Sequence, residues 1–463
     1  MAEGTTRKQE KDFTKEVDEV VTAAESLVRS GNIQNAVDKL LVLEKQTRNA
    51  SDLASTTRLL VKIVSIFFEA GDLDSLAQHV QQLSRKHGQL RQATTTMVEK
   101  VMEFLPNVNE TSKCKLLEGL REVTEGKIYL EVQRARLTRQ LAQIKEAAGE
   151  GRIANELMQD LQVETFGSMD RREKVEFILE QMRLLRIQRD WEKMAIVSKK
   201  INNKWLSDPD NEDLKLQYYA LMITYASQSS RYLDLCKYYR AIHESSTIQA
   251  DVAKSSAALR NAVYFVILAP YDNEQSDLLN RIGRSEDELK QIEGVYDLVK
   301  CFTTPELMRW PGIQELYGPT LRKSKIFGPK GTAGVPGDIE EDVEAGSDPG
   351  ETRWQELHKR VVEHNIRTVS KYYTRLTLLR LSELLDLSVP ESEETLAKLV
   401  SSKTVSAKID RPRGLVQFNL GNESSSQGEN ILNVWNSDVG KLLGLVEKTV
   451  HLIQKEFALQ GIK

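Results

Sequence analysis

The chain has 463 residues, and its 64 basic and 68 acidic residues give a formal net charge of −4 and a pI near 6.0. A chain of this length accommodates two or three domains or one elongated repeat array. The slightly acidic balance argues against a dedicated nucleic-acid binder, which usually carries a basic face. An aromatic content of 6% and only 11 prolines favour a helical chain over a β-rich one.

The cysteines and the apolar segments indicate a cellular compartment. Cys114, Cys236 and Cys301 are isolated along the chain, form no disulfide framework and favour a reducing environment. The first 19 residues are polar and contain no apolar core of a signal peptide. The longest apolar run, residues 262–269, is far shorter than the ~20 residues that a membrane span needs. We therefore expect a soluble protein of the cytoplasm and nucleus that has no membrane partner.

A repeated motif, a short turn followed by an amphipathic helix, runs through the first two thirds of the chain. The first apolar residue after each turn falls at positions separated by 40, 80, 38 and 41 residues, namely Ile33, Leu73, Ile153, Trp191 and Tyr232. The spacing of 80 contains two periods, with a weaker match near residues 109–117. A period near 40 with two helices per repeat is typical of a tetratricopeptide-like or HEAT-like α-solenoid. We assign residues 20–327 to this solenoid, in preference to a helical domain with accidental spacing.

Two segments lack the helical pattern. Residues 1–19 are polar and charged, and residues 328–350 are rich in Gly and Pro, with an acidic cluster at 338–344. Such compositions bury too little apolar surface to offset the entropy cost of ordering. Both segments are therefore predicted to be disordered, the second as an acidic linker; a specific docking peptide within it has no support in the sequence.

Residues 351–420 have the pattern of a winged helix. Apolar residues recur first at helical spacing and then at every second position. This predicts helices over 360–372 and 376–385 and from Pro390, followed by strands over 404–409 and 415–420. The sequence Arg-Pro-Arg-Gly at 411–414 is a turn between the strands. Three helices followed by a β-hairpin make a winged helix.

The last predicted element is a long helix over residues 431–460. Its apolar residues recur at steps of three and four, along a stripe ~40 Å long at 1.5 Å per residue. The sequence contains no later element to cover the stripe, and a narrow uncovered stripe usually joins a helical bundle or coiled coil. The stripe consists of Leu432, Trp435, Val439, Leu442, Val446, Val450, Ile453 and Phe457.

The sequence contains no recognisable catalytic or metal-binding motif. Its six histidines form no His-x-His or His-Glu-x-x-His arrangement, and no Cys-x-x-Cys pair is present. Neither the phosphate-binding motif G-x-x-x-x-G-K-[ST] nor the nucleophile motif G-x-S-x-G occurs. Glu363-His364 comes closest to a catalytic pair, but within an amphipathic helix such a pair is more typically solvated or capping. We therefore expect no enzyme activity, no cofactor and no metal.

A winged helix also raises nucleic-acid binding as a rival function. The third helix of such modules reads the major groove with basic and amide side chains. Here that helix begins with Glu391, Glu393 and Glu394, and residues 374–420 contain seven Lys or Arg against six Asp or Glu, a net charge of +1. This small charge attracts phosphate weakly. The alternative stays open because the wing carries three cations, Lys408, Arg411 and Arg413.

Helical repeats followed by a winged helix resemble the PCI module, which is shared by the proteasome lid, the COP9 signalosome and a translation initiation factor complex. Longer strings resemble the family of non-ATPase subunit twelve of the 26S proteasome lid: TEGKIYLEVQRARLT at 124–138, QVETFGSM at 162–169, ILAPYDNEQSDL at 267–278 and KYYTRLTLLRLSELLDLS at 371–388. The resemblance leaves out the first 30 residues and the linker. The fourth signalosome subunit has a similar architecture, but the second and third strings resemble the proteasome version.

The resemblance implies a non-catalytic scaffold that supports lid assembly and ATP-dependent degradation of ubiquitinated proteins. In that family the winged helices line up side by side and the C-terminal helices gather in a common bundle. The implied partners, within a hetero-oligomer, are other PCI subunits of the lid, the lid deubiquitinase subunit, the ATPase ring and the core particle. The alternative is a signalosome subunit involved in control of deneddylation.

The resemblance also implies two interfaces on this chain. The stripe of the terminal helix is expected to form the bundle contact, and residues 403–420 are expected to contact a neighbouring winged helix. The expected contact residues in this hairpin are Lys408, Ile409, Arg411, Arg413, Val416 and Phe418.

Overall fold

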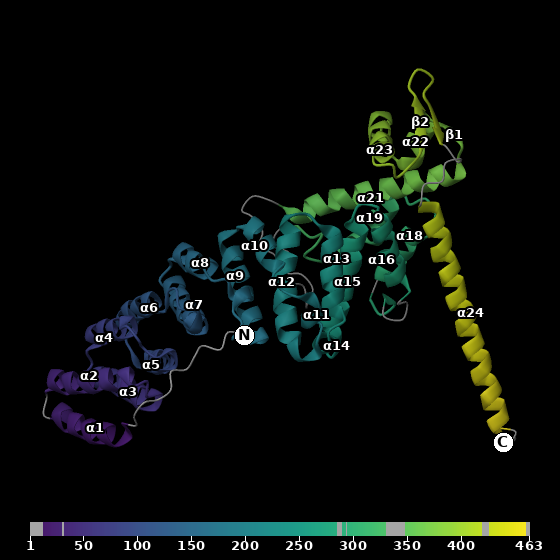
Figure 1. Ribbon diagram of the computed structural model, residues 1–463. Helices are drawn as coiled ribbons and strands as arrows, with labels where there is room; N and C mark the ends of the chain where they lie inside the picture. Colours follow the sequence, from purple (N-terminus) through teal and green to yellow (C-terminus); the bar gives the residue numbers. More distant parts are fainter. Residues whose placement is uncertain are drawn as a thin grey trace. The chain divides into compact units, whose positions relative to one another are not determined.

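The computed structural model describes residues 13–29, 32–284, 289–292, 294–329, 348–418 and 426–459, with side chains for all of these except 110–111, 426–434 and 459. The described chain is almost entirely helical and contains one small sheet (Figure 1), so the predicted fold class is confirmed. It divides into two compact units, Met1–Asn203 and Lys204–Lys463. Most of the predicted linker and of the predicted disordered N-terminus lies outside the described residues.

The first unit consists of paired antiparallel helices. They are α1 (Thr14–Arg29), α2 (Ile33–Asn49), α3 (Leu53–Glu69), α4 (Leu73–Arg85), α5 (Arg91–Phe104), α6 (Glu110–Thr124), α7 (Glu131–Ala147), α8 (Gly151–Gln159), α9 (Arg171–Gln188) and α10 (Trp191–Ser198), with 3-10 turns at Leu105–Asn107, Ile128–Leu130 and Val163–Thr165. Helix α1 begins inside the segment that was predicted to be disordered. The prediction was wrong there because Phe13 and Val17 are buried in the core of this unit.

The repeat has a regular period. One helix of each pair begins at Ile33, Leu73, Glu110, Gly151, Trp191 and Tyr232, so successive starts are 40, 37, 41, 40 and 41 residues apart. Several of the preceding turns contain a residue in the left-handed region, including Gly71 (φ 73°), Arg189 (φ 59°) and Ser230 (φ 51°). This conformation ends a helix, and Asp72 and Asp190 then cap the next one by accepting backbone hydrogen bonds. The turn chemistry therefore sets the period.

Polar contacts between consecutive pairs follow the same period. Gln81 donates to Glu122, Arg136 to Glu173 and Arg183 to Glu146, over sequence separations of 41, 37 and 37 residues. The carboxylate of Glu44 is fully buried and pairs with Arg48 of its own helix and Lys86 of the next pair, at 3.0 Å each. A buried charge costs several kcal/mol unless it is paired, so this triad fixes how the two pairs stack.

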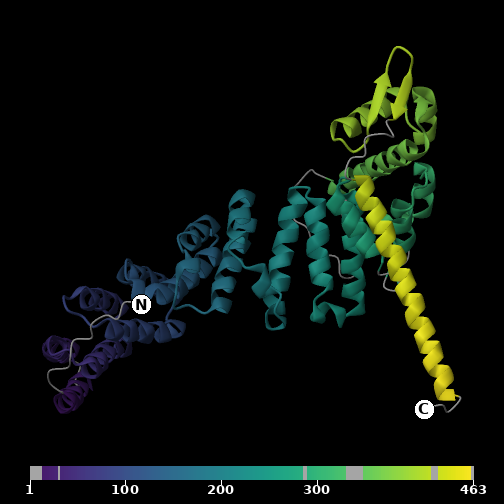
Figure 2. The ribbon, with the colours of Figure 1, turned by 45° about the vertical axis from the view of Figure 1, so that its right-hand side comes forward.

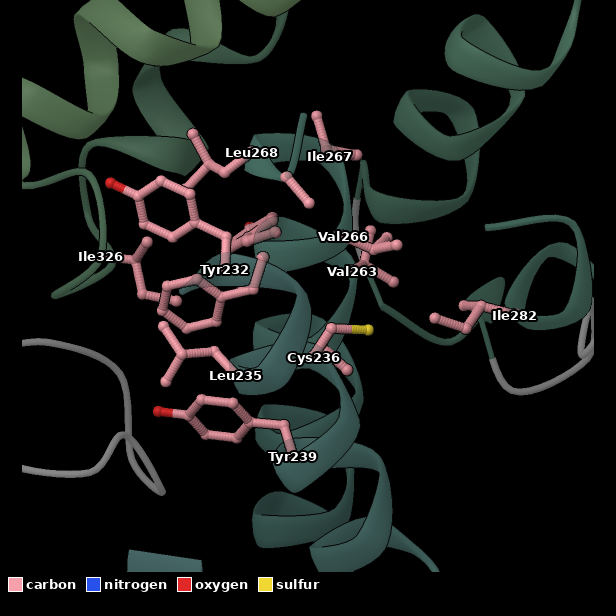
Figure 3. Close-up of a cluster of buried hydrophobic side chains, with 14 of the residues drawn as sticks. Tyr232, Leu235, Cys236, Tyr239, Val263, Val266, Ile267, Leu268, Ile282 and Ile326 are labelled. Carbon is pink, nitrogen blue, oxygen red and sulfur yellow. The ribbon is translucent and has the colours of Figure 1, made fainter. Parts of the chain in front are cut away.

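The second unit continues the helical pattern. Its helices before the winged region are α11 (Asn203–Leu206), α12 (Glu212–Gln228), α13 (Tyr232–His243), α14 (Ser246–Gln249), α15 (Val252–Leu268), α16 (Asn273–Gly283), α18 (Val295–Thr303), α19 (Trp310–Leu316) and α20 (Gly318–Leu321), with a 3-10 turn at Pro209–Asn211. Helix α15 contains the longest apolar run of the sequence, and every residue from 261 to 268 is buried. It packs against α13, α16, α18 and α21. Figure 3 shows Tyr232, Leu235 and Tyr239 of α13 in this core.

One carboxylate ties the start of α12 to α14. Glu212 accepts hydrogen bonds from the hydroxyls of Thr247 and Ser246 (2.6 and 2.7 Å) and from their backbone N–H groups (3.1 and 2.9 Å). These hydrogen bonds favour the charged carboxylate and lower the pKa of Glu212 to about 2.

We predict that Glu212 titrates near pH 2 in the folded chain. Its folded-state pKa lies below its unfolded value of ~4.3, so its contribution to stability is complete above that pH and is lost as the pH falls toward 2. NMR titration of selectively labelled glutamate side chains, with the signal assigned through Glu212→Gln, measures this. A midpoint near 4.3 for that signal would contradict the capping role.

Helix α21 (Pro349–Tyr372) belongs both to the core formed by the preceding helices of the second unit and to the core of the winged helix. Trp354 and Leu357 pack in the cluster around α13 and α15, whereas Ile366 and Val369 pack in the winged helix.

Polar contacts also hold α21 in place. The buried amide of Asn365 accepts from the N–H of Met308 (2.8 Å) and donates to its carbonyl (2.6 Å), and the Arg353 guanidinium donates to the Ser227 hydroxyl (2.8 Å).

The start of α21 lies eleven residues before the predicted start at residue 360. Asp348 accepts a hydrogen bond from the backbone of Glu351, and Pro349 occupies the first helical position, where its missing N–H costs nothing. Gly350 lies against the backbone of Gly328, and a Cβ at this position would overlap the Gly328 carbonyl. Glycine is therefore required at position 350, where the start of α21 meets the backbone at Gly328.

We predict that Gly350→Ala destabilises the second unit by about 1–3 kcal/mol, because the added methyl group forces the two backbones apart. Urea unfolding followed by circular dichroism measures the loss. Gly312→Ala is the matched control, since a Cβ at that helical glycine meets no atom within 4 Å. Equal stability of the two variants would show that the contact between Gly350 and Gly328 constrains nothing.

The winged helix contains three strands. After α21 come β1 (Arg375–Thr377), α22 (Leu378–Leu385), α23 (Val389–Ser401), β2 (Ala407–Asp410) and β3 (Leu415–Phe418), and the antiparallel sheet has the order β1-β3-β2. The predicted hairpin is present, with Ile409 opposite Val416. Strand β1 was missed, because its apolar run continues into α22 and only pairing with β3, such as Leu376 with Val416, distinguishes a strand from a helix.

Candidate assembly surfaces

Helix α24 (Ser426–Leu459) carries an exposed apolar stripe. Figure 1 and Figure 2 show it as one long helix that extends away from the winged helix. Between residues 435 and 458 every side chain is exposed except Ser437 and Gly444, which are half-buried. Leu432 lies within α24, where side chains are not described. The seven other predicted stripe residues are 40–67% exposed: Trp435, Val439, Leu442, Val446, Val450, Ile453 and Phe457.

Three further exposed leucines widen this apolar surface. At 3.6 residues per turn, Leu443 extends the stripe on one side, and Leu445 and Leu452, two turns apart, form a second row on the other. These three leucines were not among the predicted stripe residues, because they fall outside the steps of three and four by which the stripe was defined. A two-stranded coiled coil covers only one narrow stripe, so the wider surface fits contact with more than one neighbouring helix.

The hairpin offers fewer contact residues than the sequence predicted. Val416 and Phe418 are buried in the winged-helix core at 0% and 3% exposure, so they hold the hairpin together and are not surface contacts. Ile409 is half-buried, and Lys408 is exposed on β2. Because β2 pairs only with β3 in the described sheet, its outer edge is open to another chain.

Two of the three wing cations that kept nucleic-acid binding open are engaged in ion pairs. Arg411 pairs with Glu393 of α23, and Arg413 lies 3.9 Å from Asp410. Helix α23 therefore presents carboxylates at the position where a DNA-reading helix presents basic and amide side chains that donate hydrogen bonds. Two more of them are stabilised as anions, since hydrogen bonds from Ser388 lower the pKa of Glu391 and Lys398 lowers that of Glu394. The carboxylates of α23 disfavour phosphate where a DNA-reading helix would contact it, which argues against nucleic acid as the ligand.

The Glu363-His364 pair has a structural role. Glu363 pairs with Arg360 at 2.6 Å, and the buried His364 donates from Nε2 to the carbonyl of Glu306 at 3.2 Å. Burial is the main cause that lowers the pKa of His364 to about 4, so the imidazole is neutral at pH 7. The hydrogen bond holds α21 against the segment after α18.

Two further properties of the described residues bear on other classes of function. No group of three or more His, Cys, Asp or Glu side chains among them is arranged to hold a metal ion. No helix among them is both long enough and apolar enough to cross a membrane.

Comparison with known proteins matches three consecutive parts of the chain. The family described as PSMD12/CSN4, N-terminal, matches residues 35–251, and the PCI domain matches residues 306–420. The C-terminal domain of the 26S proteasome regulatory subunit RPN5 matches residues 429–461, which include most of α24. Helical arm, winged helix and terminal helix together define a PCI-domain protein.

Full-length relatives narrow the family. The 26S proteasome regulatory subunit rpn501 of Schizosaccharomyces pombe is 41% identical over 458 residues, covering 99% of this chain and 98% of the relative. RPN5 of Saccharomyces cerevisiae is 39% identical, with 98% of each chain covered. The 26S proteasome non-ATPase regulatory subunit 12 of Dictyostelium discoideum is 38% identical, with 99% and 97% covered. The chain belongs to this family, that of the proteasome regulatory subunit RPN5, also named non-ATPase regulatory subunit 12.

Proposed function

We propose that this protein is a non-catalytic scaffold subunit of the 26S proteasome lid, which supports lid assembly and the ATP-dependent degradation of ubiquitinated proteins. The observation that carries the proposal is the uncovered apolar surface of α24. Ten large apolar side chains between residues 435 and 457 are exposed on one helix. Full burial of each such side chain contributes about 1.5–3 kcal/mol, so the helix has a strong driving force to pack in a bundle.

The matched relatives support this assignment. They are named regulatory subunits of the 26S proteasome, and the match includes nearly their whole length. The family that matches residues 35–251 is described by both a proteasome and a signalosome subunit, whereas the family that matches residues 429–461 is described by the proteasome subunit RPN5. The helix that is proposed to enter the bundle therefore favours the proteasome over the signalosome.

Further partners follow from the surfaces. The open edge of β2, with Lys408 and the ion-paired Arg411 and Arg413, is proposed to contact the winged helix of another PCI subunit. The helical arm is proposed to contact the lid deubiquitinase subunit, the ATPase ring or the core particle. The chain thus acts within a hetero-oligomer, and we place it in the cytoplasm and nucleus, as its isolated cysteines favour a reducing compartment.

We predict that the double substitution Leu442→Asp with Val446→Asp lowers incorporation into the proteasome lid at least about tenfold, because two carboxylates would be buried in the bundle. Both positions are exposed in the isolated chain, so its stability should change by no more than about 0.5 kcal/mol per site. Affinity purification of the tagged variant, followed by quantitative mass spectrometry, measures incorporation.

The matched control is Lys448→Asp with Lys455→Asp on the same helix. These residues lie on the face opposite the stripe and are also exposed. The control adds two carboxylates to α24 without placing them in the proposed contact, and it should assemble normally. Normal assembly of the Leu442 and Val446 variant, or equal failure of both variants, would contradict the proposed role of the stripe.

A further inference from the structure

The second unit contains a cavity that neither assembly surface uses. Its volume is about 370 Å³, and it is lined by residues of α16, α21, positions 437–441 of α24 and the segment at the end of α18. This volume lies in the range of roughly 300–1,000 Å³ that is typical of sites for small ligands. The cavity wall is formed by side chains from positions 271 to 441, which are remote in the sequence.

The wall of this cavity carries cations that lack acidic partners. Arg367 and Lys371 are four residues apart on α21 and so lie on the same face of that helix. Within the described part of the chain neither has a carboxylate at ion-pair distance, since Glu363, one turn earlier, pairs with Arg360. The third cation, Lys441 of α24, is 3.6 Å from Asp438. The lining therefore has a net charge of +2.

The environment of Arg367 makes its positive charge unfavourable. The guanidinium carbon lies 3.7 Å from the centre of the Tyr271 ring, and the Nε atom is buried without a hydrogen-bond partner in the described structure. Burial is the main cause that lowers the pKa of Arg367. Two cations that disfavour each other in a partly enclosed cavity are stabilised when an anion binds between them.

We propose that this cavity binds the phosphate group of a small phosphorylated molecule. A phosphate monoester carries about −1.5 to −2 charges at pH 7, which matches the net charge of the lining. Arginine and lysine are the usual phosphate-binding side chains, the first through its fork of donors and the second as a point charge. The half-buried hydroxyl of Ser276 on α16 provides a further donor in the lining.

Such a ligand would contact α24 as well as α16 and α21. It would thereby fix the orientation of α24 relative to α16 and α21. The concentration of a phosphorylated metabolite would then be coupled to packing of the helix bundle. This coupling rests on the assembly role proposed above, whereas binding of the ligand does not depend on that role.

The test uses the full chain and isothermal titration calorimetry with pyrophosphate as the probe. We expect saturable binding at one site, weakened about tenfold or more by Lys371→Ala and by Arg367→Gln, since each substitution removes a charge-assisted hydrogen bond to the phosphate. Lys371 is exposed, so its substitution should not affect folding. Lys359→Ala, which removes an exposed lysine on the same helix outside the cavity, should bind as the unsubstituted chain does.

Three outcomes would overturn the phosphate site. These are no heat of binding with millimolar pyrophosphate, equal weakening by Lys371→Ala and Lys359→Ala, and binding of acetate as tight as that of pyrophosphate. The last would assign the cavity to a carboxylate, such as that of a partner side chain. None of these measurements involves the lid, so failure of the site leaves the assembly role untouched. Failure of the Leu442 and Val446 variant to lose assembly would in turn leave the site untouched.

Discussion

The second unit depends on one continuous helix that belongs to two hydrophobic cores. The first half of α21 buries Trp354 and Leu357 among the helices of the arm, and its second half buries Ile366 and Val369 in the winged helix. A helix is stiff over this length, so the winged helix is held in register with the preceding helices of the same unit. Two hydrogen bonds hold the same helix against the segment after α18. The Asn365 side chain accepts from the N–H of Met308, and the neutral His364 donates to the carbonyl of Glu306.

The winged helix and α24 carry the two proposed assembly surfaces. The winged helix buries its own core residues, including Val416 and Phe418, and leaves the edge of β2 open. Helix α24 follows, with its large apolar side chains exposed. Exposed apolar surface of this extent is unfavourable in water, and this is the physical basis of the assembly role proposed for α24.

The sequence predicted what local chemistry determines and missed what tertiary contact determines. Turns with Gly-Asp or Arg-Asp placed the helix starts at Leu73 and Trp191 correctly, because backbone conformation and capping act within a few residues. The start of α21 was missed because its capping residues, Asp348 and Pro349, lie within a segment whose composition indicates disorder. The burial of Val416 and the cavity around Arg367 depend on elements that are distant in the sequence, so no local pattern reports them.

The measurement that tests the account most directly is the composition of the complex that contains this chain. The tagged protein should be purified under mild salt and its partners identified by mass spectrometry. If the chain is a lid scaffold, the other PCI subunits of the proteasome lid should be recovered with it, together with the ATPase ring and the core particle. Recovery of signalosome subunits alone, or of the chain as a free monomer, would contradict it.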